Sequence, residues 1–299
     1  MLVARDVFLE YVHVGEELKT YLDVVKSVLD NGIRKSNRTG VDTLSLFGVS
    51  YTLDMKEGFP LLTTKQISWK NIICENLWFL SGKPHIHFLQ KHGCKFWNPW
   101  ADKSGFVPSA YGNLWRNFPT QRRHHDGSVY SFYFDQIDWV LNELKRNPDS
   151  RRLVVSAWNP GNACSSKLPP CHYSFVLNVQ GDELNIMVPQ RSLDVALGLP
   201  YNIAGYAFLL HLFAHMTGLK PGKFMHAITD CHIYVNHIEA LKKQLSRSPK
   251  PLPQLHINRI SSLESIEQIV DDFTTKEILE YFNITNYAPH PEIKFKVAV

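Results

Sequence analysis

A paired run of alternating residues in the middle of the chain constrains the fold most strongly. In residues 173–188, apolar side chains occupy every second position on either side of the polar turn 180–183. This alternation around a short polar turn is typical of a β-hairpin. The apolar positions are Tyr173, Phe175, Leu177 and Val179 before the turn, and Leu184, Ile186 and Val188 after it.

The hairpin predicts that reactive side chains meet at one end of a sheet. Cys171 stands just before the first strand, and Arg191, Ser192 and Asp194 follow just after the second. Because the strands of a hairpin are antiparallel, we expect the thiol and the guanidinium to lie at the same end. A neighbouring arginine favours the thiolate, which is the nucleophilic form of cysteine.

Periodicity elsewhere predicts both helices and strands. Residues 105–115 are expected to form a loop, and the polar residues 121–128 a surface excursion. The segment 203–217 is apolar almost all round and predicts a buried helix with Asn202 at its N-terminus, where asparagine is a favoured cap. The other predicted helices cover 16–31, 69–81, 86–92, 135–146 and 236–245, and the other strands cover 43–53, 153–158 and 225–234.

Several polar and aromatic residues allow both a structural and a functional interpretation. Glu75 lies in a mostly apolar helical pattern, so its carboxylate either faces water or sits in a cleft where it moves protons. Trp97 and Trp100 lie three residues apart around a proline, which is a poor place to bury two indoles and favours a stacked planar ligand.

Three arginines also have two interpretations. Arg38 lies on a loop, and Arg151 and Arg152 enter a continuous apolar strand. Each is either a solvated surface residue or part of a phosphate site, because a guanidinium offers a planar fork of donors.

Composition excludes some classes of protein. The formal net charge is only +4, with scattered basic residues, so nucleic-acid binding is not expected as the main function. The five cysteines have no CxxC spacing, and no signal peptide is visible. We therefore expect a reducing compartment, the cytoplasm, with neither a disulfide scaffold nor a metal site. The apolar runs are too short to span a membrane.

A cysteine-hydrolase dyad is the first alternative for Cys171. Residues adjacent on a strand point to opposite faces, so His172 is badly placed as its base. His232 is a possible base, but a hydrolase leaves the arginines and Asn202 without a role. Attack by a thiolate on an electron-poor ring that carries a phosphate uses all of them.

The chain resembles the thymidylate synthase family from end to end. The resemblance rests on several motifs that occur together and in order. They are Asn37-Arg38-Thr39-Gly40, Phe59-Pro60-Leu61-Leu62-Thr63-Thr64-Lys65, residues 75–82, Tyr111-Gly112, Arg151-Arg152, Pro170-Cys171-His172, Gln190-Arg191-Ser192, residues 197–204 and His232-Ile233-Tyr234.

The resemblance implies a fold and a reaction. It implies one α/β domain over residues 1–299, built on a mixed β-sheet flanked by helices, in a homodimer whose sheets pack together. It also implies that Cys171 adds to C6 of dUMP, so that C5 attacks the methylene group of 5,10-methylenetetrahydrofolate, giving dTMP and dihydrofolate.

The resemblance further implies a role for each matching residue. Arg38, Arg191 and Ser192 would hold the phosphate together with Arg151 and Arg152 of the partner subunit. His232 and Tyr234 would bind the deoxyribose, Asn202 the base, and Glu75 and Tyr111 would move protons. The residues implied to contact folate are Trp97, Trp100, Leu168, Asp194, Leu197, Gly198 and Val299.

Departures from the family pattern cluster near the folate positions and leave the product open. Phe96, Pro189, Tyr201 and Gly205 replace commoner residues, as does the segment 108–110. Pyrimidine nucleotide hydroxymethylases, close relatives of the family, let water rather than hydride capture the methylene group. A nucleotide- or RNA-binding regulator is the third alternative, although it would need only some of these residues.

Overall fold

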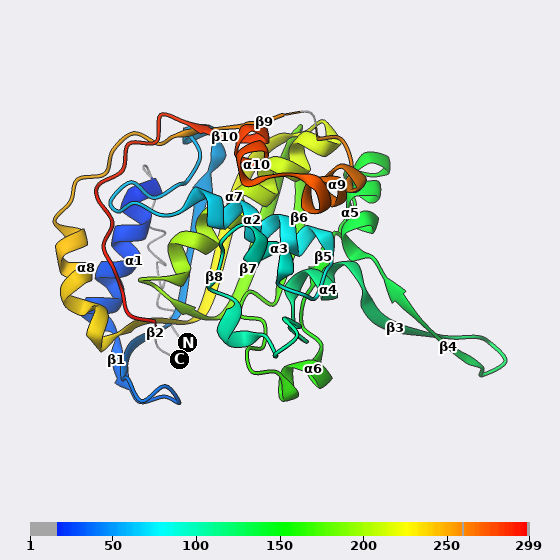
Figure 1. The fold of residues 1–299 in the computed structure, drawn as a ribbon, viewed down its shortest axis with the longest axis horizontal. Helices are drawn as coiled ribbons and strands as arrows, with labels where there is room; N and C mark the ends of the chain where they lie inside the picture. Colours follow the sequence, from blue (N-terminus) through cyan, green and yellow to red (C-terminus); the bar gives the residue numbers. More distant parts are fainter. Residues whose placement is uncertain (1–16, 259, 298–299) are drawn as a thin grey trace, which may run out of the picture.

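The protein is built around a six-stranded mixed sheet with helices packed against it (Figure 1). The computed structural model describes residues 17–258 and 260–297. Strands β7 and β8 are parallel, and the other neighbouring pairs in the order β1-β2-β8-β7-β6-β5 are antiparallel. The strands are β1 Ile33–Lys35, β2 Thr43–Asp54, β5 Val154–Ser156, β6 Ser174–Gln180, β7 Glu183–Asp194 and β8 Lys220–Tyr234. This confirms the predicted α/β class and mixed sheet.

Two short ribbons lie outside the main sheet. Strands β9 (Gln254–Ile257) and β10 (Phe282–Thr285) form one of them. Strands β3 (Phe118–Arg123) and β4 (Val129–Phe134) form the other, a hairpin that projects from the body of the molecule (Figure 1). The expected surface excursion at 121–128 contains the tip of this hairpin.

Helix α7 forms the centre of the core. It is apolar on every side, as the sequence predicted, and it packs against β7, β8 and α2. The helices are α1 Glu17–Asn31, α2 Trp69–Ser81, α3 His87–Lys91, α4 Tyr111–Arg116, α5 Gln136–Arg146, α6 Pro160–Ser165, α7 Gly198–Thr217, α8 Ile238–Leu245, α9 Leu263–Asp272 and α10 Thr275–Tyr281. Among these described helices none is long and apolar enough to cross a membrane.

Two predicted boundaries in the central segment were wrong. Strand β7 continues through Asp194, because its far end pairs with β8 after the hairpin pairing with β6 has stopped. Helix α7 begins at Gly198 rather than at 203. Pro200 lies in the first turn of this helix, where the amide N–H groups have no intrahelical partner, so proline is tolerated there.

The predicted loop 105–115 was also wrong in part, because Tyr111–Arg116 is helix α4. This helix lies against α2 so closely that a Cβ atom on Gly112 would stand 2.0 Å from the carbonyl oxygen of Phe79. Glycine is therefore required for the contact. The predicted strand 153–158 is shorter than expected, with only Val154–Ser156 in the sheet.

The sheet face turned away from α7 carries a continuous, uncharged row of side chains. Val154 pairs with Val176, Val176 with Met187, Met187 with Met225, and Met225 with Thr52. Within this row Val154, Met187 and Met225 are 45%, 40% and 38% exposed. An exposed apolar row of this extent is typical of a surface that another protein covers.

Candidate active site

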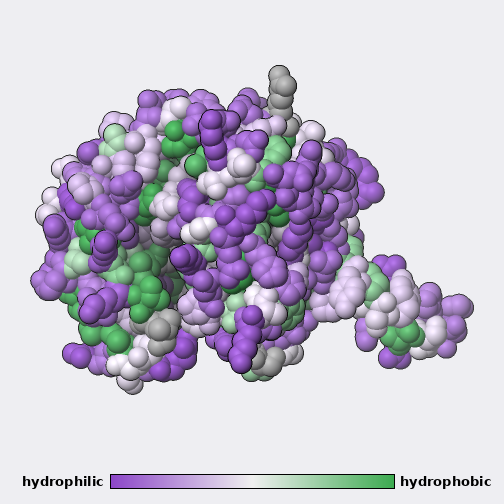
Figure 2. All heavy atoms as spheres, in the orientation of Figure 1, coloured by the Kyte–Doolittle hydropathy of each residue, from purple (hydrophilic) through white to green (hydrophobic). Residues whose placement is uncertain are grey.

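The topology brings several chain segments to one edge of the sheet. Because β7 and β8 are parallel, their ends at Asp194 and Tyr234 lie together. Strand β2 begins at the same edge, since Thr43 pairs with Tyr234, and the loop carrying Arg38 precedes it. Strand β6 is antiparallel to β7, and the backbone N–H of Arg191 donates to the carbonyl of Cys171 at 2.9 Å. On the face drawn in Figure 2, a hollow lies left of centre, with hydrophobic residues on its left side and hydrophilic residues on its right.

The Cys171 thiol lies beside the Arg191 guanidinium. Arg191 Nη2 is 3.5 Å from Sγ, and the same guanidinium donates to the carbonyls of Pro169 and Pro170 at 2.7 and 2.8 Å. The predicted contact is therefore confirmed. The predicted preference for the thiolate is not, because burial raises the pKa of Cys171 more than Arg191 and Arg38 lower it. A thiolate at this position would therefore require a proton acceptor or further positive charge.

Tyr111 holds the backbone of Cys171. Its hydroxyl accepts the Cys171 N–H at 2.7 Å, which leaves the phenolic proton available to another acceptor. Burial, with a smaller effect of Cys171, raises the pKa of Tyr111 well above its usual value. The ring stacks on His172 at 3.9 Å between centroids and 11° between planes.

His172 is engaged away from the thiol. Its Nδ1 lies 2.7 Å from the Tyr206 hydroxyl, and burial lowers its pKa to about 3. The ring is therefore neutral and hydrogen-bonded to helix α7. This agrees with the expectation that His172 does not act as the base for Cys171.

Glu75 has the properties of a proton-transfer group. Burial raises the pKa of its carboxyl to about 7, although the hydrogen bond from Trp97 Nε1, 2.6 Å from Oε1, acts to lower it. The carboxylate also acts electrostatically on Tyr111. Of the two structural possibilities for this residue, the structure favours a carboxylate at the site over one that faces bulk water.

The two indoles of the 97–100 segment have different surroundings. Trp97 is only 6% exposed and packs against Trp78, Phe79 and Tyr111, whereas Trp100 is half-buried. The expectation that both would be open to a planar ligand was therefore wrong for Trp97. Its indole N–H donates to Glu75, and helices α2 and α4 supply the aromatic side chains that bury its ring.

Asn202 lies in the second turn of α7 and does not cap it. Leu197 is the N-cap residue, and Asn202 Oδ1 instead accepts from Gln190 Nε2 at 3.2 Å. Gln190 also donates to the carbonyl of Ser192 at 3.0 Å. The sequence offered one sign of this contact. Gln190 is a polar residue at a position of β7 where the alternation places side chains on the inward face.

The remaining predicted site residues interact mainly with their close neighbours. His232 lies next to Asp230, with Nδ1 3.2 Å from Oδ1, and the charges of Arg38 and Cys171 both act on Tyr234. Asp194 Oδ1 accepts the N–H groups of Ala196 and Leu197 at 2.8 and 3.2 Å. Leu168, Leu197 and Gly198 are half-buried. Val299 lies outside the described residues.

Arg151 and Arg152 are not brought to the thiol within this chain. Both side chains are exposed, and within residues 17–258 and 260–297 neither guanidinium makes a hydrogen bond or an ion pair. The guanidinium charges that act on Cys171 are those of Arg191 and Arg38.

The unusual residues near the folate positions have structural roles. The Tyr201 hydroxyl accepts the backbone N–H of Ser68 at 3.4 Å. A Cβ atom on Gly205 would lie 3.1 Å from Asn76 Nδ2, so glycine leaves room for that amide. The Ser109 hydroxyl donates to the Leu168 carbonyl at 2.7 Å and thereby positions this residue.

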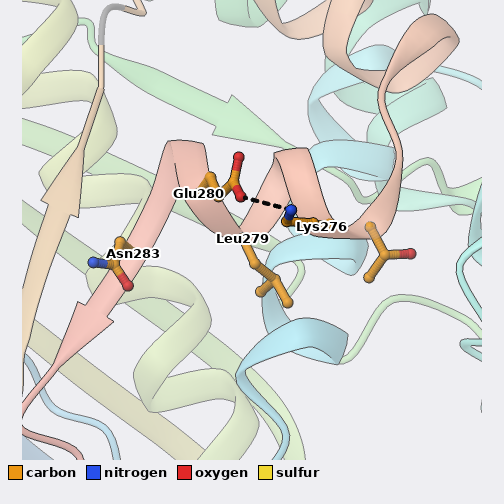
Figure 3. A pocket seen from close by; sticks show the side chains of 5 residues that line it. Lys276, Leu279, Glu280 and Asn283 are labelled. Atoms are coloured by element: carbon orange, nitrogen blue, oxygen red, sulfur yellow. Dashed lines mark ion pairs between the residues drawn. The ribbon is translucent and has the colours of Figure 1, made fainter.

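A surface pocket beside α10 is separate from these residues. Thr275, Lys276, Leu279, Glu280 and Asn283 line it, and an ion pair of 3.7 Å joins Lys276 to Glu280 (Figure 3). It contains none of the predicted site residues.

A thiol beside a guanidinium, with a buried carboxyl group whose pKa is raised to about 7 and a fixed carboxamide, is a set of groups typical of covalent nucleophilic catalysis. A family model described as thymidylate synthase matches residues 19–299. The chain therefore belongs to the thymidylate synthase family. This family is of the methyltransferase type, transfers a one-carbon unit to dUMP and uses methylenetetrahydrofolate.

Proposed function

We propose that the protein converts dUMP and 5,10-methylenetetrahydrofolate into dTMP and dihydrofolate. The observation that carries this proposal is the contact of Cys171 with both Arg191 and Tyr111. Glu75 acts electrostatically on Tyr111, and Asn202 is held by Gln190, the neighbour of Arg191 in the chain, which supports the proposal further. A hydrolase would need only the first of these groups and a base, whereas addition to a pyrimidine ring uses all five.

In the proposed mechanism the Cys171 thiolate forms a bond to C6 of the uracil ring. The π electrons of the C5–C6 bond then make C5 nucleophilic. The negative phosphate of dUMP, bound by Arg38, Arg191 and Ser192, brings the substrate to the thiol. Glu75, with its pKa of about 7, exchanges protons with the ring, and Tyr111 assists the removal of the C5 proton.

The folate side of the site is consistent with a flat, partly polar cosubstrate. Trp100, Leu168 and Tyr201 are partly buried apolar residues packed on the core. Asp194 uses Oδ1 for backbone N–H groups, and no described residue donates to Oδ2. That oxygen can accept from a ring N–H of the folate. Methylenetetrahydrofolate would supply both the one-carbon unit and the hydride.

The proposed active form is a homodimer. The uncharged row that includes Val154, Met187 and Met225 is the proposed contact surface between two copies. Arg151 lies three residues before this row, at its edge, beside Arg152. Their exposed, unpaired guanidinium groups support the proposal that each subunit lends them to the phosphate site of the other.

The product of the reaction tests this proposal. Mass spectrometry of the nucleotide formed from dUMP and methylenetetrahydrofolate distinguishes a methyl from a hydroxymethyl group, and absorbance detects dihydrofolate. We expect dTMP with one dihydrofolate per turnover. The Tyr201 hydroxyl accepts the Ser68 N–H and keeps its own proton for a water, so only the product decides between the two reactions. Hydroxymethyl-dUMP without dihydrofolate would assign the protein to the hydroxymethylases, and the absence of any product would reject both reactions.

A further inference from the structure

A buried chain of hydrogen bonds connects β2, β8 and β7 with Asn202. The Tyr51 hydroxyl lies 2.7 Å from His226 Nδ1, and His226 Nε2 lies 2.9 Å from Gln190 Oε1. Gln190 Nε2 then donates to Asn202 Oδ1 at 3.2 Å. Tyr51, His226 and Gln190 are 8%, 0% and 2% exposed. Neither Tyr51 nor His226 has a role in the mechanism above.

The Ser192 carbonyl sets the direction of this chain. A backbone carbonyl only accepts, so the Gln190 group that faces it at 3.0 Å must be the NH₂ group. Gln190 Oε1 therefore faces His226, which must donate from Nε2. Burial lowers the pKa of His226 to about 3, so the ring is neutral and carries one N–H. Nδ1 is then the acceptor, and Tyr51 donates to it.

This direction fixes the amide of Asn202. The second N–H of Gln190 requires an acceptor, so Oδ1 faces Gln190 and Nδ2 is left to donate toward the site. Uracil presents an acceptor at O4 and a donor at N3, which suit Nδ2 and the second lone pair of Oδ1. Cytosine presents the opposite pattern and requires a flipped amide, which would place the NH₂ groups of Asn202 and Gln190 against each other.

We propose that His226, held by Tyr51, is a positioning residue that determines the preference of the site for uracil over cytosine. It acts by keeping Gln190 against Asn202. Without the His226 donor, Gln190 Oε1 is a buried acceptor with no partner, and the side chain gains by turning away from Asn202 toward another donor. The Asn202 amide is then free to flip. This inference rests on the proposed function, since it assumes that Asn202 contacts the pyrimidine.

The alternative is that the contact between Tyr51 and His226 contributes only to the stability of the core. A purely structural pair changes stability when it is removed but leaves the ratio of the two nucleotide activities unchanged. Tyr206 and His172 provide a matched control, because they form a second buried tyrosine–histidine pair with a 2.7 Å contact and no hydrogen bond to Gln190.

The experiment compares His226→Leu, His226→Gln, Tyr51→Phe and Tyr206→Phe with the unmodified protein. For each, kcat/KM is measured with dUMP and with dCMP, and binding of both nucleotides is measured by calorimetry. We expect His226→Leu to lower the dUMP-to-dCMP ratio about tenfold or more, because one buried hydrogen bond in a specificity site has that effect. His226→Gln keeps a donor toward Gln190 and should stay within about threefold of the original ratio. Tyr51→Phe should lower the ratio by a smaller factor, and Tyr206→Phe should leave it unchanged.

A folded His226→Leu protein with an unchanged ratio would overturn the inference. If that variant does not fold, an unchanged ratio in Tyr51→Phe overturns it instead. Failure of the proposed function is distinct, because the unmodified protein would then either leave dUMP unbound and unconverted or yield hydroxymethyl-dUMP in place of dTMP. A protein that prefers dUMP and keeps its preference in the variants retains the proposed function and loses only this inference.

Discussion

Replacement of Glu75 by glutamine should stabilise the folded protein while it removes activity. Burial raises the pKa of Glu75 from 4.5 to about 7. Since one pKa unit corresponds to about 1.4 kcal/mol, ionising this carboxyl costs roughly 3 kcal/mol more in the folded than in the unfolded chain. Glutamine cannot ionise, and its carbonyl can still accept from Trp97 Nε1.

The stability gained by Glu75→Gln depends on pH. The folded pKa lies above the unfolded value, so the unfolded chain loses the proton first. The wild-type protein therefore loses stability as pH rises from about 4.5 to about 7. Below that window the two proteins should differ little through this effect. The stability gained by Glu75→Gln should be about 2 to 3 kcal/mol larger at pH 8 than at pH 5.

Urea denaturation at both pH values measures this difference. A matched control is Glu239→Gln, because the Glu239 carboxylate is 85% exposed and has no burial cost to relieve. Turnover of dUMP by Glu75→Gln should be lost at both pH values. A gain that is equal at pH 5 and pH 8, or that Glu239→Gln reproduces, would refute the claim that buried ionisation of Glu75 opposes folding.

Three further predictions concern the nucleophile, the dimer and the base. Cys171→Ser should abolish turnover while calorimetry still detects dUMP binding, because a serine alkoxide is far harder to form than a thiolate; near-normal turnover would exclude the covalent mechanism. Mixed Arg152→Ala and Cys171→Ser subunits should regain activity, because one of the two sites then has both residues; inactive mixtures, under conditions where subunits exchange, would argue against shared sites. Asn202→Asp should raise the kcat/KM for dCMP relative to dUMP by about tenfold or more, because Gln190 can still donate to one carboxylate oxygen while the other accepts the cytosine amino group. An unchanged ratio would mean that residue 202 does not contact the base.

The sequence by itself determined the elements whose pattern is local. The hairpin around residues 180–183 and helix α2 followed directly from the spacing of apolar residues, and helix α2 has the predicted bounds. The placement of Cys171 beside Arg191 followed from hairpin geometry alone. These predictions succeed because a hairpin turn and a helical repeat depend on residues close together in the chain.

Only the tertiary structure decided the groups that control the chemistry. The pKa of Cys171 depends on burial by distant segments, and the pKa of Glu75 is raised because its burial in the core outweighs the hydrogen bond from Trp97. The role of Asn202 likewise depended on Gln190. No local pattern reveals such contacts, because desolvation and hydrogen-bond direction depend on every element that packs around a group. The sequence therefore determined that Cys171 and Arg191 meet at the sheet edge, and the packing decided the protonation and orientation of the groups around them.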